Sequence, residues 1–84
     1  MTTKEDIKEW FKRGKEKGAI YLLVICDTFD WQDYPVFCDT IEEAQKARTK
    51  YLSGENMQKL MEIYDLRENM NNQINGYKSF AEIK

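Results

Sequence analysis

The sequence contains no histidine, which removes both the commonest general base and the commonest metal ligand from the available chemistry. Its four glycines stand apart, at positions 14, 18, 54 and 76, and form neither a glycine-rich phosphate loop nor a dinucleotide-binding fingerprint. The two cysteines, Cys26 and Cys38, do not have the spacing of a zinc site. These absences remove the usual sequence motifs of enzymes, and we expect a protein with no catalysis, no metal and no cofactor.

Long apolar segments are also missing from the chain. The longest apolar run, Ala19–Cys26, is far too short to cross a bilayer. The first 18 residues are polar and charged, unlike a signal peptide. We therefore expect a cytoplasmic protein that makes no membrane contact and whose two cysteines are thiols.

The length and composition indicate one small folded domain over residues 1–84. The chain has 84 residues, of which 42% are hydrophobic and 13% are aromatic, which suits one core and no more. The net charge of −2 argues against a general nucleic-acid binder. A core of this size has little stability to spare, so association between copies would help.

Capping residues and hydrophobic periodicity predict six elements in the order α-β-β-α-β-α. Ser, Thr and Asp cap the starts of helices, and glycine ends them in the left-handed conformation. The predicted elements are a helix from Thr3 to Gly18, strands over 19–26, 34–38 and 57–66, a helix capped by Thr40 that stops at Gly54, and a last helix from Asp65 to Tyr77.

The composition of the strands predicts an α+β fold whose three-stranded sheet has the order 2-1-3. The first strand is apolar at every position, which is typical of a central strand buried on both faces. Pro35 cannot donate to a strand ladder and places the second strand at an edge. We expect the helices to pack mainly on one face. The other apolar face would then need a partner, which predicts a homodimer or higher oligomer.

The loop between the first two strands is the leading candidate site, because it gathers three aspartates and three large aromatic side chains. Aromatic rings in a short loop either pack over the end of the sheet or bind a partner, and the sequence leaves both possibilities open. The candidate partner-binding residues are Phe29, Asp30, Trp31, Asp33 and Tyr34.

The acidic residues of this region have several possible roles. Residues 19–45 contain six acidic residues and no Lys or Arg. They could form an acidic binding face, or they could serve a turn and a helix N-terminus. Asp27, Asp30 and Asp33 could also hold a divalent metal in a metal-dependent phosphodiesterase, but their spacing does not match a calcium loop. We favour the turn-forming role.

Basic side chains at the end of the first helix form a second candidate site, for an anion. They would contact phosphates if the aromatic loop lay nearby, within one chain or across a subunit boundary, and a nucleotide could then be held. Otherwise they offset the helix dipole in solvent. The residues are Lys12, Arg13, Lys15 and Lys17.

Four stretches, residues 10–19, 24–31, 33–36 and 56–64, resemble a group of small open reading frames carried by phages and mobile elements. The resemblance covers most of the chain and implies no activity or catalytic residue. It implies a context in which small accessory proteins work by stoichiometric binding, including inhibition of host defence. We therefore expect a phage-type accessory protein that binds a host protein or a nucleotide signal. The alternatives are the phosphodiesterase and a purely structural or regulatory oligomer.

Overall fold

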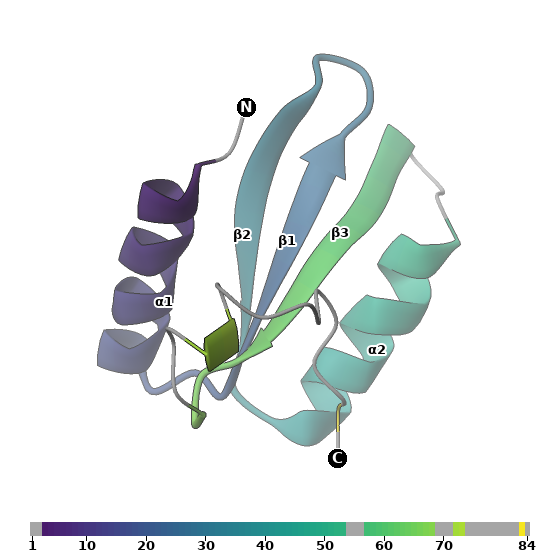
Figure 1. Cartoon of the computed structure of the whole chain (residues 1–84). Coiled ribbons are helices and arrows are strands. Elements are labelled where there is room, and N and C mark those ends of the chain that lie inside the picture. Colours follow the sequence, from purple (N-terminus) through teal and green to yellow (C-terminus); the bar gives the residue numbers. More distant parts are fainter. Residues whose placement is uncertain (1–2, 54–56, 69–71, 74–82, 84) are drawn as a thin grey trace.

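The computed structural model describes residues 3–53, 57–68, 72–73 and 83 (Figure 1). Its elements are α1 (Lys4–Lys17), β1 (Tyr21–Asp27), β2 (Gln32–Cys38), α2 (Ile41–Leu52) and β3 (Gln58–Asp65). β1 is the central strand and pairs antiparallel with both neighbours, which gives the sheet order β2-β1-β3. The predicted α+β class, the order of the first five elements and the 2-1-3 sheet are confirmed.

The last predicted helix, from Asp65 to Tyr77, lies mostly outside the described residues. Within the described part, Asp65 ends β3, residues 66–68 form a turn, and Asn72 and Gln73 are helical. Gln73 binds back to the strand: its Oε1 accepts from the backbone N–H of Asp65 (2.7 Å), and its Nε2 donates to the carbonyl of Asp65 (2.7 Å). The chain after β3 therefore returns to the end of the sheet.

Local sequence determines where α1 begins and ends. Thr3 Oγ1 accepts from the backbone N–H of Asp6 (3.2 Å), and Asp6 Oδ2 accepts from the backbone N–H of Thr3 (3.0 Å), which completes a capping box. Gly18 ends the helix in the left-handed conformation, with φ 82°. Both ends agree with the prediction.

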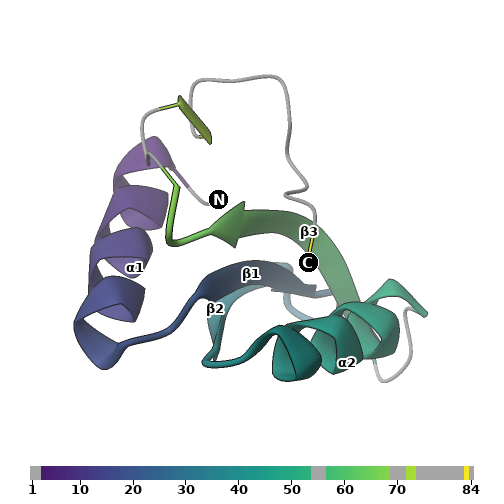
Figure 2. The ribbon, with the colours of Figure 1, turned by 90° about the horizontal axis from the view of Figure 1, so that it is seen from below.

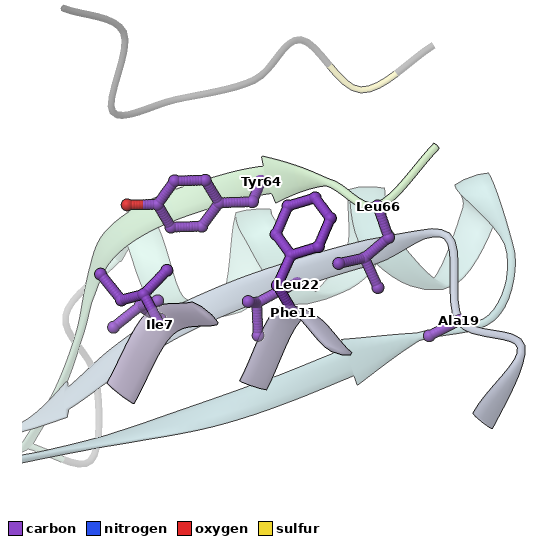
Figure 3. Close-up of a cluster of buried hydrophobic side chains, with 7 residues drawn as sticks. Ile7, Phe11, Ala19, Leu22, Tyr64 and Leu66 are labelled. Atoms are coloured by element: carbon purple, nitrogen blue, oxygen red, sulfur yellow. The ribbon is translucent and has the colours of Figure 1, made fainter. Parts of the chain in front are cut away.

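The two helices cover opposite faces of the sheet, so the prediction that they pack mainly on one face is wrong. In Figure 2, α2 lies below the sheet, while the buried side chains of α1 belong to a separate cluster. The α1 cluster consists of Ile7, Phe11, Ala19, Leu22, Val24, Tyr64 and Leu66 (Figure 3). The α2 cluster consists of Tyr21, Leu23, Ile25, Cys38, Ala44, Leu60 and Ile63.

The composition of β1 explains this arrangement. Residues 21–26 are all buried, and successive side chains of a strand point to opposite faces. Two helices on one face would leave half of these side chains in water, whereas one helix on each face buries both sets within a single chain. The expectation of an oligomer was drawn from an uncovered face, and that reason no longer holds.

Gly14 lies on the buried face of α1 and allows this helix to lie close to the sheet. A methyl group at this position would lie 2.6 Å from Leu66 Cδ1 and 2.9 Å from Phe37 Cδ1. Figure 3 shows Phe11 and Leu66 side by side in the same cluster. A larger residue would push the helix away from these side chains.

The end of the sheet where β1 begins holds a polar network, which we call the Tyr21 end (Tyr21, Asp65 and Arg67). Tyr21 is fully buried and Asp65 is 8% exposed. Arg67 donates from Nε to Asp65 Oδ1 (3.0 Å), and from Nη2 to Asp65 Oδ2 (3.0 Å) and to Tyr21 Oη (2.9 Å). This bidentate pair satisfies the polar groups that the strands bury here.

The outer strands both carry features that disfavour pairing with a further strand. β2 contains Pro35 opposite Val24 of β1. The pairing of β3 with β1 shifts between Val24 and Ile25, which leaves Met61 as an extra residue in β3. Extension of the sheet by another chain is therefore hindered at either edge.

Candidate binding site

The candidate site is built on the turn that joins β1 to β2, residues 28–31, which we call the aromatic turn. The two strands stay paired up to Asp27 opposite Gln32. The backbone N–H of Trp31 donates to the carbonyl of Asp27 (2.7 Å), which closes the turn. In Figure 1 this connection stands at the top of the molecule, beyond the ends of both helices.

Two of the three aspartates hold the backbone of this turn. Asp27 Oδ1 accepts from the backbone N–H of Phe29 (2.9 Å), and Asp30 Oδ1 accepts from the backbone N–H of Gln32 (3.3 Å). A carboxylate that binds the N–H two residues ahead is a common way of forming a turn. The turn-forming role is confirmed for Asp27 and Asp30.

The rings of the aromatic turn lie outside the core. The exposed fraction of Phe29 is 78% and that of Trp31 is 72%. The sequence left open whether these rings close over the end of the sheet or remain available, and the structure leaves them in solvent. Large aromatic side chains in this state are more typical of an interaction site than of a core.

Met57 is a further exposed apolar residue beside the turn and was not among the predicted site residues. The backbone N–H of Thr28 donates to the carbonyl of Met57 (2.7 Å), and the Met57 side chain is 58% exposed. The sheet order provides the signal that could have found it, because β3 runs antiparallel to β1 and begins beside the end of β1. We call Phe29, Trp31 and Met57 the turn surface.

The turn surface also carries unusual backbone conformations. Among the described residues, the non-glycine residues with positive φ are Trp31 (58°) and Met57 (60°). The left-handed conformation costs an L-residue about 1–2 kcal/mol, and bulky side chains rarely occupy it. Such strain is concentrated at functional sites. Here it coincides with large exposed apolar side chains.

The other two predicted partner-binding residues, Asp33 and Tyr34, are in β2 and only half exposed. Asp33 lies opposite Cys26. Tyr34 packs against the α2 cluster, and its Oη accepts from Gln58 Nε2 (2.7 Å). Burial and the neighbouring Tyr51 raise the pKa of Tyr34. The structure therefore places Asp33 beside the turn surface and turns Tyr34 toward the core.

The basic residues of α1 do not meet the aromatic turn within one chain. α1 leads into the start of β1, whereas the turn follows the end of β1 (Figure 1). Arg13 forms an ion pair with Glu9 (2.9 Å). The Nζ atoms of Lys15 and Lys17 lie 5.5 and 5.1 Å from the centres of phenylalanine rings. The predicted combination of Lys12, Arg13, Lys15 and Lys17 with the aromatic rings is not formed.

The acidic segment is divided between the two ends of β2. Its second half, Asp39, Glu42 and Glu43, lies at the start of α2. Thr40 Oγ1 accepts from the backbone N–H of Glu43 (3.1 Å), while Glu43 Oε2 accepts from the backbone N–H of Asp39 (3.0 Å). Thr40 is the N-cap of α2, Glu43 binds the backbone just before it, and Glu42 pairs with Lys46, so the segment does not form a single acidic face.

The two cysteines are free, buried and distant from each other in the hairpin. Cys26 lies opposite Asp33, and Cys38 lies opposite Tyr21 at the other end of the strands. Burial raises the pKa of the Cys26 thiol, and its hydrogen bond to Asp33 adds to this rise. Burial also raises the pKa of Cys38 to about 11. Neither thiol is activated as a nucleophile.

The described part of the chain has neither a cluster of metal ligands nor a membrane-spanning helix. No three His, Cys, Asp or Glu side chains come together there in a group that could hold a metal ion. No helix among the described residues is long and apolar enough to cross a membrane.

Comparisons with known proteins assign the chain to no group. No family model, no curated protein and no solved structure matches it.

Proposed function

We propose that this chain is a non-catalytic binding protein that attaches to a partner protein through the turn surface. The observation that carries the proposal is the coincidence of exposure and strain: Trp31 and Met57 hold large apolar side chains in solvent on backbone conformations that disfavour them. Exposed Trp side chains are frequent energetic centres of protein interfaces. A partner that covers these side chains would recover the burial that the isolated chain lacks.

The geometry favours a protein partner over a nucleotide signal. Recognition of a nucleotide needs cations for the phosphates beside the rings that stack on the base. In one chain these two groups lie at opposite ends of β1. The phosphodiesterase hypothesis also has little support, because Asp27 and Asp30 already hold the backbone of the turn.

Several further expectations belong to the same proposal. The resemblance to phage and mobile-element proteins implies a partner in a bacterial host's defence system and a cytoplasmic site of action. Formation of a homo-oligomer, including the purely structural or regulatory one, also stays a prediction. Any association would have to use side-chain surfaces, because both outer strands carry features against strand pairing.

The proposal is tested by affinity capture with matched variants. The tagged protein is incubated with lysate of a bacterial host, and retained proteins are identified by mass spectrometry. The test variants are Trp31→Ser and Met57→Ser. The control is Met61→Ser, which replaces a side chain that is 39% exposed on β3, away from the turn.

We expect one host protein to be retained by the wild type and by Met61→Ser, and to be reduced at least about tenfold by Trp31→Ser. Circular dichroism of each variant checks that the fold is intact. Equal retention by all variants, or no retained protein, would refute the proposal.

A further inference from the structure

The turn surface is bordered by negative charge. Residues 27–33 contain three aspartates and no Lys or Arg. Asp30 is exposed in the turn itself, and Asp27 and Asp33 are half-buried on the adjoining strands. On the neighbouring strand β3, the basic residue Lys59 lies opposite Cys26 near this end of β1. The apolar side chains are therefore presented together with an excess of carboxylates.

This charge restricts the chemistry of the partner. Carboxylates beside the rings repel phosphate groups, so they disfavour nucleic acid and anionic membranes. They attract Lys and Arg side chains, which border many protein interfaces. The side chains also project from a tight turn, and a projecting turn fits a hollow better than a flat surface.

We infer that the partner presents an apolar pocket bordered by Lys or Arg side chains, which receives Trp31 and Phe29 while its cations face Asp30 and its neighbours. This inference rests on the proposed function and adds the chemistry of the partner's site. In such a complex the aromatic rings contribute most of the affinity, while the carboxylates orient the partner and increase the rate of association.

The test separates these two contributions with a charge variant that preserves the turn. Asp30→Asn removes the negative charge but keeps an oxygen that can accept from the backbone N–H of Gln32. Asp39→Asn is the matched control, because it removes an exposed carboxylate at the opposite end of β2. Association and dissociation rates of the captured host protein are measured for both variants and for Trp31→Ser.

We expect Asp30→Asn to slow association roughly threefold and to leave dissociation nearly unchanged, because a charge at the rim acts mainly on the encounter. The difference from wild type should vanish near 1 M salt, where the screening length is about 3 Å. Asp39→Asn should match the wild type. Trp31→Ser should instead raise the dissociation rate at least about tenfold.

A photo-crosslinker in place of Phe29 then identifies the partner's residues. A crosslinked peptide that lines a pocket with Lys or Arg at its border supports the inference. A crosslinked peptide without such cations refutes the inference while the proposed function stands. The same holds if Asp30→Asn associates as fast as the wild type at low salt. If added phosphatidylcholine vesicles displace the captured protein, or if Trp31→Ser has no effect on its binding, both the inference and the proposed function are refuted.

Discussion

The two ends of the central strand use similar residues for opposite purposes. At the Tyr21 end, an aromatic ring and an aspartate are buried, and Arg67 binds both. At the aromatic turn, two aromatic rings and an aspartate are exposed, and the carboxylate holds only the turn's own backbone. The first arrangement gives stability to the isolated chain. The second leaves apolar side chains in solvent, where the proposed partner would bind.

The difference teaches that residue type does not decide between a buried and an exposed position. Tyr21 has side chains from both neighbouring strands beside it, because it pairs with Cys38 on β2 and Asp65 on β3. Trp31 lies beyond the last paired residues, where neither helix covers it. What differs is the number of neighbouring elements, which depends on position in the fold.

The largest expected difference between the two ends is in the stability lost when an aromatic side chain is removed. Tyr21→Ala should lower the free energy of unfolding by about 3–5 kcal/mol, since it leaves a cavity in a fully buried position. Trp31→Ala should change it by less than about 0.5 kcal/mol. Urea titrations followed by circular dichroism measure both.

If Tyr21→Ala does not fold, Tyr21→Phe keeps the ring and removes only the hydrogen bond to Arg67. It should be measurably less stable than the wild type. Equal losses for the Tyr21 and Trp31 alanine variants would show that the two ends do not differ as described.

The second effect concerns the pH dependence of stability at the Tyr21 end. Burial raises the pKa of Cys38 from its ordinary value of 9.0 to about 11. The folded chain thus holds this proton more tightly than the unfolded chain. The resulting stability is complete below about pH 9 and is lost as pH rises through about 11.

We therefore expect the unfolding free energy of the wild type to fall more steeply than that of Cys38→Ala between about pH 9 and 11. Urea titrations at stepped pH measure the two slopes. The raised pKa of Tyr64 acts in both proteins and cancels in the difference. Parallel curves would contradict the prediction.

The third effect compares the residues with positive φ that flank β1. Gly18→Ala should cost about 1–2 kcal/mol, because φ is 82° and alanine disfavours it. Trp31→Gly should instead raise stability by about 0.5–1 kcal/mol, since glycine adopts this conformation without strain. Thermal unfolding of both variants tests the signs, and a loss of stability in Trp31→Gly would argue against strain in the turn.

The smallest effect is spectroscopic. Trp31 is largely exposed, whereas Trp10 is partly buried against the α1 cluster. Acrylamide should quench the wild type more strongly than Trp31→Phe, because the variant keeps only the protected indole. Equal quenching constants would mean that Trp31 is covered in solution.

Much of the fold could be predicted because its signals are local. The caps at Thr3 and Gly18 define α1, and the uniformly apolar β1 belongs in the centre of the sheet. The same uniformity also calls for a helix on each face of the sheet, which the prediction of both helices on one face did not take into account. A strand that is apolar on both faces does not indicate which helix covers which face.

The site was predicted only in part. The aspartates and the rings of the turn could be found from composition, but their exposure depends on neighbours that the sequence does not place. Met57 joins the turn surface through a backbone hydrogen bond across 29 positions of sequence, from Thr28. The exposure of Met57 depends on strand pairing and on its backbone conformation, and the residues next to it in the sequence predict neither.

The hydrogen bonds of the aromatic turn have a thermodynamic consequence. The backbone N–H groups of Thr28, Phe29 and Trp31 are all bonded, to Met57 and Asp27. A loop held in this way has already lost most of its conformational entropy in the free protein, so little ordering remains for the moment of binding. Calorimetry of a complex should therefore show a heat-capacity change of the size expected for burying the turn surface alone, with no contribution from folding of the loop.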